Sequence, residues 1–232
     1  INILECIKKF SNKTRFFQAS SSELFSEGKN QLVDENSKFK PLSPYAIAKL
    51  SAYYYSNIYR EFYKIYAVNG ILFNHESPLR KDEFLTKKII KGLVNYKYHK
   101  SKDVIEVGNI NTKRDWGNAE DFARVIYKSL TINKPNDFIF CTGKKYSVKD
   151  FINFTANILD ISIKWIKQKK GYIAIDSKTG NVIIKTNNKF FRKDHLHNFR
   201  GNNQKARTLL NWKPDDNIDK LIKKMIAFEL NK

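Results

Sequence analysis

The sequence predicts an α/β fold: the C-terminal part of a doubly wound parallel sheet, with a smaller α/β lobe attached. Strand-like and helix-like stretches alternate over the first 145 residues, the order that produces parallel strands joined by helices. Two strand-like runs then flank a turn-forming segment at 176–181, which indicates a hairpin outside that alternation. We therefore expect residues 1–145 to form the sheet domain, with one helix of the lobe interleaved, and residues 146–232 to form mainly the lobe and the C-terminal helices.

The elements of the first 145 residues follow from hydrophobic period and from capping residues. Ser43-Pro44 starts the longest helix, because proline fits the first helical turn. Asn118 has the side chain of an N-cap for a later helix. The expected helices are 1–10, 44–64, 84–96 and 120–130, and the expected strands are 15–19, 66–73, 104–107 and 138–141.

The remaining chain is expected to supply the strands of the lobe and the terminal helices. Ser147 caps a helix that ends near Leu159, and Trp212-Lys213-Pro214 separates the last two helices. The expected strands are 163–166, 172–175 and 182–184, and the expected terminal helices are 203–210 and 217–230.

The composition is that of a globular protein without a membrane or nucleic-acid partner. Of the 232 residues, 41% are hydrophobic, enough for one sizeable core. No apolar run approaches the roughly 20 residues of a membrane span. The net charge of +20 raises the question of nucleic-acid binding. The lysines are spread along the chain, however, and no nucleic-acid-binding module is recognisable.

The two cysteines indicate neither a disulfide framework nor a metal site. Cys6 lies on an expected helix and Cys141 at the end of an expected strand, without the spacing of metal ligands. We expect both to be buried and reduced, which favours a cytoplasmic location. We expect no metal.

Tyr45 and Lys49 are the first candidate catalytic pair. They stand at positions i and i+4, which a helix places on one face. An ammonium beside a phenol favours the phenolate, so a tyrosine with an ordinary pKa of about 10 can act as a base nearer neutral pH. The same spacing recurs twice within 96–102, but there it lies in a solvated basic helix end.

Two polar segments at the ends of expected strands supply context for this pair. Residues 20–23 (Ser-Ser-Ser-Glu) and 74–78 (Asn-His-Glu-Ser-Pro) each follow a strand, and ligands bind at the carboxyl ends of parallel strands. Taken alone, Glu23 is as well explained as a turn carboxylate that caps backbone, and Tyr45 as an ordinary aromatic helix residue. The three segments together favour a catalytic site.

At these residues the chain resembles the GDP-mannose 4,6-dehydratases, which are extended short-chain dehydrogenase/reductases. The resemblance runs from Ile3 to the C-terminus and is strongest in QASSSEL (18–24), YAVNGILFNHESP (66–78), GNINTKRDWG (108–117) and NWKP (211–214). It implies a Rossmann-type sheet that binds NADP and a smaller substrate-binding lobe. It further implies conversion of GDP-mannose to GDP-4-keto-6-deoxy-mannose by internal oxidation, elimination of water and reduction, in nucleotide-sugar metabolism such as GDP-fucose biosynthesis.

The resemblance also implies roles for the catalytic candidates. Tyr45 would take the proton of the 4-hydroxyl, and Lys49 would lower its pKa and hold the nicotinamide ribose. Ser21 would hydrogen-bond the same oxygen, with serine in place of the family's usual threonine. Glu23 matches the carboxylate that serves elimination across carbons 5 and 6.

Binding residues are implied in the same way. His75 and Arg80 match cofactor contacts, although Leu79-Arg80 replaces the family's Arg-Arg pair. A guanidinium can bridge phosphate oxygens in a bidentate way, which suits a diphosphate substrate. The positions that match substrate contacts are Asn74, Lys88, Arg114 and Arg192. The motif around Arg114 is intact, whereas the segment after Arg192 lacks the family's proline and glutamate.

The chain resembles only part of a family member. Its one methionine is Met225, and it contains no Gly-x-x-Gly-x-x-Gly turn of the kind that holds a cofactor pyrophosphate. We expect an N-terminally truncated form, and a homo-oligomer when full length. The alternatives are another nucleotide-sugar epimerase or dehydratase, which would share Tyr45 and Lys49, and an inactive fragment that acts only as a binding or assembly partner.

Overall fold

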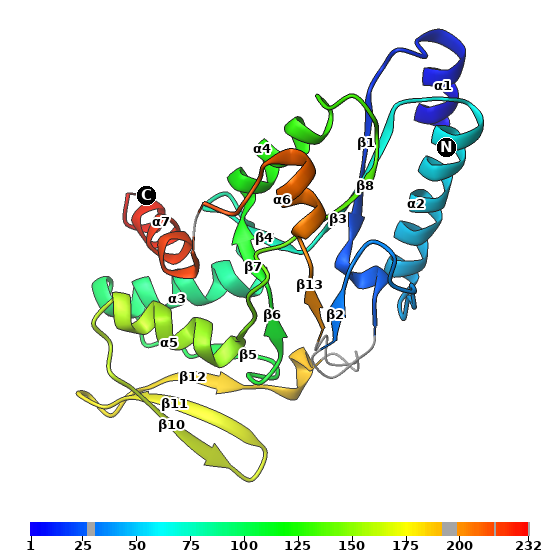
Figure 1. Ribbon diagram of the computed structural model, residues 1–232. Helices are drawn as coiled ribbons and strands as arrows, with labels where there is room; N and C mark the ends of the chain where they lie inside the picture. The colour runs from blue at the N-terminus through cyan, green and yellow to red at the C-terminus, as the bar shows by residue number, and fades with distance from the viewer. Residues whose placement is uncertain (27–30, 192–198, 216, 232) are drawn as a thin grey trace. The chain divides into compact units, whose positions relative to one another are not determined.

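The structure is a computed structural model, and it describes residues 1–26, 31–191, 199–215 and 217–231 (Figure 1). The chain divides into two compact units that alternate along the sequence. The first unit consists of Ile1–His75, Asp115–Lys145 and His197–Asp215, and the second of Glu76–Arg114, Tyr146–Leu196 and Asp216–Lys232. The division at residue 145 expected from the sequence stays a prediction. In the structure, residues 76–114, which contain the helix expected to belong to the lobe, lie in the second unit, and residues 197–215 lie in the first.

Three parallel strands form the main sheet of the first unit. They are β1 (Phe16–Ser21), β3 (Ala67–Leu72) and β8 (Asp137–Phe140), in the order β1-β3-β8. Ser21 is the register partner of Leu72, which is in turn the partner of Phe140. The three strands therefore end at the same edge of the sheet.

Helices cover both faces of this sheet (Figure 1). α1 (Asn2–Phe10) and α2 (Pro44–Phe62) pack on one face, with Leu4, Ile7, Tyr59 and Ala67 in the core between them. α4 (Ala119–Ser129) and α6 (Gln204–Leu210) pack on the other, with Val68, Phe122, Val125 and Phe138 in the core. The doubly wound parallel sheet that the sequence predicts is confirmed.

The capping signals that start the helices are in place. Ser43 caps α2 by accepting a hydrogen bond from a backbone N–H at 3.1 Å, and Pro44 occupies the first turn. Asn118 caps α4. Ser147 and Asp150 form a capping box at the start of α5 (Val148–Ile158).

The second unit contains a four-stranded sheet. Its strands in order are β10 (Ile163–Gln168), β11 (Gly171–Asp176), β12 (Val182–Thr186) and β5 (Ile105–Val107). The first three are antiparallel, which confirms the hairpin, and β5 runs parallel to β12. The interpretation of 104–107 as a strand of the main parallel sheet was wrong. Ile105 instead fills the space that Gly92 leaves on α3 (Leu85–Tyr98), and this packing draws β5 into the second unit.

Three helices of the second unit, α3, α5 and α7 (Ile218–Leu230), pack against one another. Their buried side chains include Ile89, Leu93, Ile152, Leu221 and Ile222. Lys87 of α3 and Glu229 of α7 form an ion pair that is almost fully buried. This pair joins the two helices within the core of the unit.

Several short elements were not expected from the sequence. Their two or three residues are too few for a hydrophobic period to be read. They are the 3-10 turns η1 (Ser22–Leu24) and η2 (Asn188–Phe190), and the strands β2 (Leu32–Val33), β4 (Asn74–Glu76), β6 (Lys113–Arg114), β7 (Trp116–Asn118), β9 (Tyr146–Ser147) and β13 (Arg200–Gly201).

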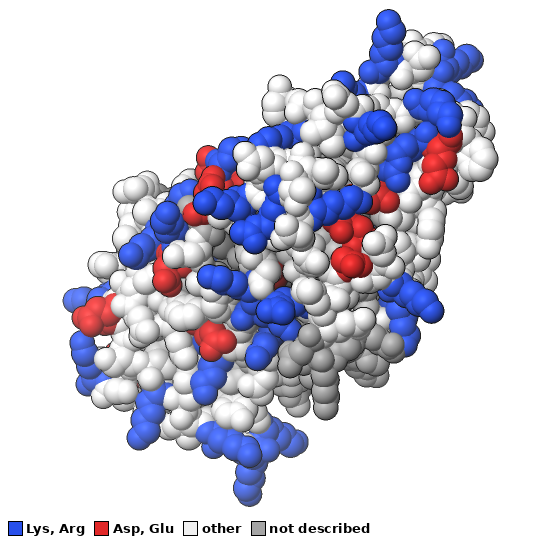
Figure 2. Space-filling view, viewed as in Figure 1, with Lys and Arg blue, Asp and Glu red and all other residues white. Residues whose placement is uncertain are grey.

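The cysteines and the charges are placed as follows. Cys141 is buried, as expected, but Cys6 is exposed, because α1 turns Leu4 and Ile7 inward and leaves Cys6 on its outer side. Figure 2 shows lysine and arginine side chains scattered over the visible face rather than gathered in one patch. Within the described ranges, no helix has the length and apolar character needed to cross a membrane.

Candidate active site

The carboxyl end of β1 presents a hydroxyl and a carboxylate. Ser21 ends the strand, and its Oγ accepts a hydrogen bond from the Glu23 backbone N–H at 3.2 Å, which starts η1. The serine, and not the glutamate, therefore caps this turn. The Glu23 side chain is half-buried and has no hydrogen bond or ion pair to another described residue.

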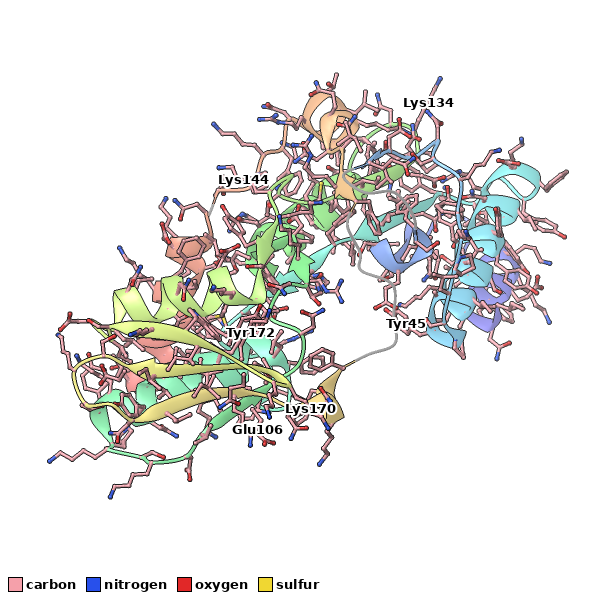
Figure 3. All side chains as sticks on the ribbon, turned by 90° about the horizontal axis from the view of Figure 1, so that it is seen from below. Tyr45, Glu106, Lys134, Lys144, Lys170 and Tyr172 are labelled. Atoms are coloured by element: carbon pink, nitrogen blue, oxygen red, sulfur yellow. The ribbon has the colours of Figure 1, made fainter. Side chains whose placement is uncertain are left out.

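Tyr45 and Lys49 reach the same strand end from α2. Tyr45 lies in the first turn of the helix, and its side chain is 52% exposed (Figure 3). Lys49 Nζ lies 5.8 Å from the centre of the Tyr45 ring and donates a hydrogen bond to Ala19 O at 2.9 Å. Because Ala19 precedes Ser21 by two residues, this bond brings the ammonium, the phenol and the serine to one end of β1.

The neighbouring strand β3 leads into Asn74 and His75. His75 Nδ1 lies 2.9 Å from Phe73 O, and the ring stacks on Phe122 with centroids 5.2 Å apart. A carbonyl oxygen only accepts, so His75 Nδ1 carries a proton and donates in this contact. Asn74 follows Leu72, the register partner of Ser21, by two residues, so both segments extend from the same edge of the sheet.

Arg80 belongs to the second unit, where it is tied to a buried carboxylate. Its Nε lies 3.2 Å from Glu76 Oε2, an ion pair whose angle is not that of a hydrogen bond, and its guanidinium lies 3.8 Å from the centre of the Phe84 ring. Burial raises the pKa of Glu76, while a hydrogen bond from Thr86 at 2.7 Å and the charge of Arg80 lower it. Arg80 is thus held by protein groups on two sides.

The expected substrate contacts are divided between the units: Asn74 lies in the first, and Lys88 and Arg114 lie in the second. Lys88 Nζ lies 4.2 Å from the centre of the Phe190 ring. Arg114 stands opposite Tyr146 in the short β6–β9 ladder. Arg192 lies outside the described residues. The structure therefore gathers Ser21, Glu23, Tyr45 and Lys49 in the first unit, while Arg80, Lys88 and Arg114 are described within the second.

Sequence reasoning missed Asp115, although it stands directly after Arg114 in the intact RDWG motif. The carboxylate is 3% exposed and accepts hydrogen bonds from Thr142 N, Thr142 Oγ1 and Gly143 N at 3.0, 2.7 and 2.7 Å. Burial raises the pKa of Asp115 to about 6, and these hydrogen bonds oppose the rise. Asp115 thereby holds the turn that follows β8.

Across the ranges that the structure describes, no three His, Cys, Asp or Glu side chains gather as metal ligands. The chemistry available at the end of β1 is that of a phenol, an ammonium, a hydroxyl and a carboxylate, which together can move protons.

A sequence model of the family described as GDP-mannose 4,6 dehydratase matches residues 1–225, which is nearly the whole chain. The chain belongs to the GDP-mannose 4,6-dehydratase family. Two relatives illustrate the match. A GDP-mannose 4,6 dehydratase from Dictyostelium discoideum is 37% identical over 99% of this chain and 65% of its own length, and one from Drosophila melanogaster is 35% identical over 99% of this chain and 58% of its own length.

This chain therefore spans less than two thirds of the length of these two GDP-mannose 4,6-dehydratases. Among solved structures, RMD from Pseudomonas aeruginosa, which is complexed with NADPH, superimposes with a TM-score of 0.81 over 100% of this chain and 71% of that one. The identity is 18%, so this likeness concerns the fold.

Proposed function

We propose that this chain provides the proton-transferring residues for conversion of GDP-mannose to GDP-4-keto-6-deoxy-mannose. The observation that carries the proposal is the Lys49–Ala19 hydrogen bond, which brings Tyr45 and Lys49 to the end of β1 beside Ser21 and Glu23. Membership of the GDP-mannose 4,6-dehydratase family supports this substrate. The net reaction oxidises carbon 4 of the hexose, reduces carbon 6 and releases water, so it consumes no external oxidant.

The residues at the end of β1 suit the nicotinamide end of NADP as the cofactor. When bound, NADP supplies the hydride acceptor and donor that the reaction needs. Lys49 has three N–H groups, of which one is committed to Ala19 O, so two remain for ribose hydroxyls. His75 and Arg80 are the further proposed cofactor contacts. The sequence contains no glycine-rich turn for the pyrophosphate, so the fit concerns the nicotinamide end alone.

Oxidation at carbon 4 requires a base for the hydroxyl proton. The Tyr45 side chain is 52% exposed, and its phenolate form can receive that proton and become the neutral phenol. Lys49 Nζ lies 5.8 Å from the centre of the same ring. Ser21 Oγ accepts from the Glu23 N–H, which leaves its own proton to donate to the substrate oxygen. The two hydroxyls would thus hold and deprotonate one oxygen.

Elimination of water requires a base for the carbon-5 proton, which the 4-ketone makes acidic. Glu23 is the proposed base, because its carboxylate is half-buried beside Ser21 without a described partner that would compete for it. The C5–H bond gives its proton to Glu23, the C5=C6 bond forms, and the C6–O bond breaks. The departing hydroxyl takes up the proton that Glu23 received from carbon 5 and leaves as water.

For the nucleotide, we propose contacts from Asn74, Lys88, Arg114 and Arg192. A planar guanidinium can donate two parallel hydrogen bonds to the oxygens of a diphosphate, and an ammonium adds a point charge. Lys88 and Arg114 are half-buried cationic side chains of the second unit, a level of exposure that allows them to contact a ligand.

The reaction is tested by incubating GDP-mannose and NADP with this chain and following the hexose by NMR. Because the chain covers 65% of the Dictyostelium relative, a fusion protein is assayed beside it, in which the unmatched part of that relative is joined ahead of Ile1. Appearance of a 6-methyl signal with loss of the C6 hydroxymethyl signals supports the proposal. No conversion by the chain or by the fusion, with both folded, contradicts it.

We further propose a homo-oligomer in which α2 faces a second copy. The apolar side chains Ile47, Tyr54, Ile58 and Phe62 follow helical spacing and are exposed by 44 to 75%. A stripe of this kind favours burial against a partner. Sedimentation of the chain and of the Ile58→Glu variant tests the proposal, which expects the variant to shift to a smaller species.

A cytoplasmic location is the remaining part of the proposal. Cys6 and Cys141 are both free thiols in the structure. Unpaired cysteines suit a reducing compartment. Fractionation of the cells that express the chain tests this location.

A further inference from the structure

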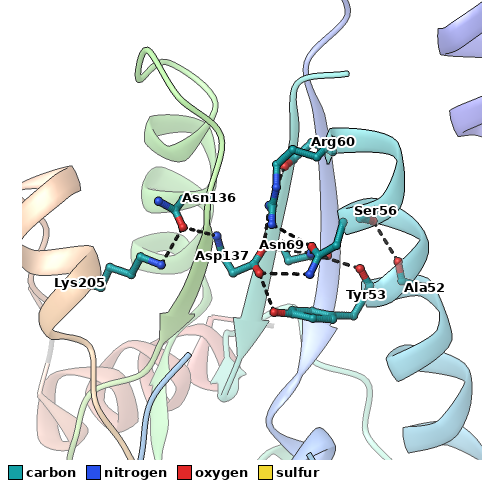
Figure 4. Close-up of polar contacts among 10 residues, drawn as sticks. Ala52, Tyr53, Ser56, Arg60, Asn69, Asn136, Asp137 and Lys205 are labelled. Carbon is teal, nitrogen blue, oxygen red and sulfur yellow. Dashed lines mark hydrogen bonds and ion pairs between the residues drawn. The ribbon is translucent and has the colours of Figure 1, made fainter. Parts of the chain in front are cut away.

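Helix α2 is joined to the main sheet by a buried polar cluster that lies away from Tyr45 and Lys49 (Figure 4). The cluster centres on Asp137, the first residue of β8, and includes Asn69 of β3. Its other members, which we call the α2 polar face, are Tyr53, Asn57 and Arg60. Asp137 stands immediately before the apolar residues Phe138–Phe140 in β8.

Both oxygens of Asp137 are engaged. Tyr53 Oη donates to Oδ2 at 2.5 Å, and Arg60 donates to Oδ1 at 2.7 Å. Asn69 Nδ2 also donates to Oδ1, at 3.0 Å. The carboxylate therefore receives donors from two turns of α2 and from the neighbouring strand, which determines both the rotation of the helix and its position along the sheet.

The ionisation states of the cluster support this geometry. Burial acts to raise the pKa of Asp137, but the hydrogen bonds from Arg60 and Tyr53 outweigh it, and the pKa lies below its usual value. Burial and the adjacent charge of Asp137 raise the pKa of Tyr53, so its hydroxyl keeps its proton. The side chains of Arg60 and Asp137 are 17% and 12% exposed. Asp137 is thus a permanent acceptor and Tyr53 a permanent donor.

Asn69 has one well-paired side-chain atom in this cluster and one that is unpaired within the described ranges. Its Nδ2 faces three acceptors, on Tyr53, Asn57 and Asp137, while its Oδ1 is buried with no hydrogen-bond partner among the described residues. A buried polar atom without a partner is unfavourable. A buried ion pair generally adds little stability compared with apolar side chains of similar volume. It can instead favour one packing arrangement of the helix over others.

The cluster and the candidate catalytic pair are on one continuous helix. Tyr53 follows Lys49 by four residues, and Lys49 follows Tyr45 by four, so the three side chains lie near one face of α2. Lys49 bonds to β1 and Tyr53 bonds to β8, the two outer strands of the sheet. Rotation or sliding of α2 at Asp137 would therefore withdraw Lys49 Nζ from Ala19 O.

We propose that Asp137 is a positioning residue, which holds α2 so that Lys49 and Tyr45 reach the end of β1. This inference rests on the proposed function for its catalytic meaning, but its geometric content is independent of that function. Asp137 touches no reacting group in this proposal. It acts through Tyr53 and Arg60 on the helix that carries the pair.

The test uses the 232-residue chain and measures the acetylation rate of Lys49 relative to exposed Lys13 by mass spectrometry. The variants are Asp137→Asn and the milder Tyr53→Phe, which keeps the ring and loses its bond to Asp137. We expect the Lys49/Lys13 ratio to rise about two- to tenfold in Asp137→Asn, as for the loss of one typical hydrogen bond at Lys49. Tyr53→Phe is expected to raise the ratio less.

Val125→Ala is the matched control, because it removes buried volume from α4 on the opposite face of the same sheet. It destabilises the first unit without touching the α2 polar face, and we expect its ratio to equal that of the unaltered chain. An equal rise in Val125→Ala, or no rise in the two cluster variants, overturns the proposal. If Asp137→Asn does not fold, as judged by circular dichroism, Tyr53→Phe decides the result.

Kinetics of the fusion protein separate this inference from the proposed function. Tyr53→Phe is expected to lower kcat severalfold and to leave the KM for GDP-mannose within about twofold, because misplacement of the base affects the reaction more than binding. A fusion protein without turnover contradicts the proposed function but leaves the labelling ratio as a complete test of positioning. An unchanged kcat together with an unchanged ratio contradicts the positioning role.

Discussion

Lys49 of α2 donates a hydrogen bond to the main-chain oxygen of Ala19 on β1 at 2.9 Å. The two residues are 30 positions apart in the sequence, and the bond closes the distance between a helix start and a strand end. It places an ammonium within reach of both the Tyr45 ring and the Ser21 turn. The candidate active site depends on this contact more than on any residue taken alone.

Tyr45→Phe should abolish most of the turnover of the fusion protein. Loss of a positioned general base lowers rates by at least about a hundredfold. Tyr98→Phe is the matched control, because Tyr98 and Lys102 have the same spacing but Tyr98 is an exposed residue at the end of α3. Steady-state rates with GDP-mannose are measured for both variants. Comparable losses in both variants would remove Tyr45 from the proposed mechanism.

Glu23→Gln should permit oxidation at carbon 4 and block elimination, because an amide cannot accept the carbon-5 proton. The reaction is run in deuterated water, and NMR measures both the incorporation of deuterium at carbon 5 and the formation of the 6-methyl product. We expect neither label nor product above background. Product formation at the unaltered rate would remove Glu23 from the proposed mechanism.

The ion pair between Lys87 and Glu229 should be costly to break. Lys87→Met removes the ammonium that neutralises the buried Glu229 carboxylate, and we expect the free energy of unfolding to fall by about 3–5 kcal/mol. The double variant Lys87→Met/Glu229→Leu should recover most of that loss, because both charges are then absent. Chemical denaturation of the unaltered chain, Lys87→Met, Glu229→Leu and the double variant is the measurement. A double variant no more stable than the single one would contradict this account.

Asp115 should make stability fall as pH rises from about 4 to about 6. Its pKa in the folded chain is about 6, above the usual 3.8, so in this window the folded state holds a proton that the unfolded state has lost. The stabilisation is complete below pH 4 and disappears through pH 6. About two pKa units correspond to about 3 kcal/mol.

The Asp115→Asn variant tests this directly, because it cannot titrate. Relative to this variant, the unaltered chain should lose about 3 kcal/mol of unfolding free energy between pH 4 and pH 7, measured by urea denaturation. Asp103→Asn, at an exposed carboxylate, should give a curve parallel to that of the unaltered chain. Parallel curves for Asp115→Asn would contradict the raised pKa.

The 232-residue chain should bind NADP more weakly than the fusion protein. Pyrophosphate affinity in such folds comes from backbone N–H groups and from the dipole at a helix N-terminus after a glycine-rich turn, and this sequence has no such turn. We expect at least about a tenfold difference in Kd by isothermal titration. Equal affinities would show that Tyr45, Lys49 and their neighbours suffice for the cofactor.

The sequence by itself determined the regular elements and the chemistry. Capping residues such as Ser43 and Ser147 and the alternation of apolar runs predict the long helices and strands, because these signals are local and act over one or two helical turns. The Tyr45–Lys49 spacing and the Ser-Glu segment predict a proton-transfer site, because the acid–base groups of these side chains are known from the residue types alone.

Only the tertiary structure decided which strands pair and which charges become buried. β5 pairs with β12 and not with the main sheet, because Ile105 packs on Gly92. Nothing in the sequence around either residue predicts this contact. Asp115, Asp137 and Lys87 read as ordinary charged residues in the sequence. Their environments come from segments distant in the chain, and burial is a property of the packed molecule, so no local pattern could have predicted the raised pKa of Asp115 or the anchoring of α2 at Asp137.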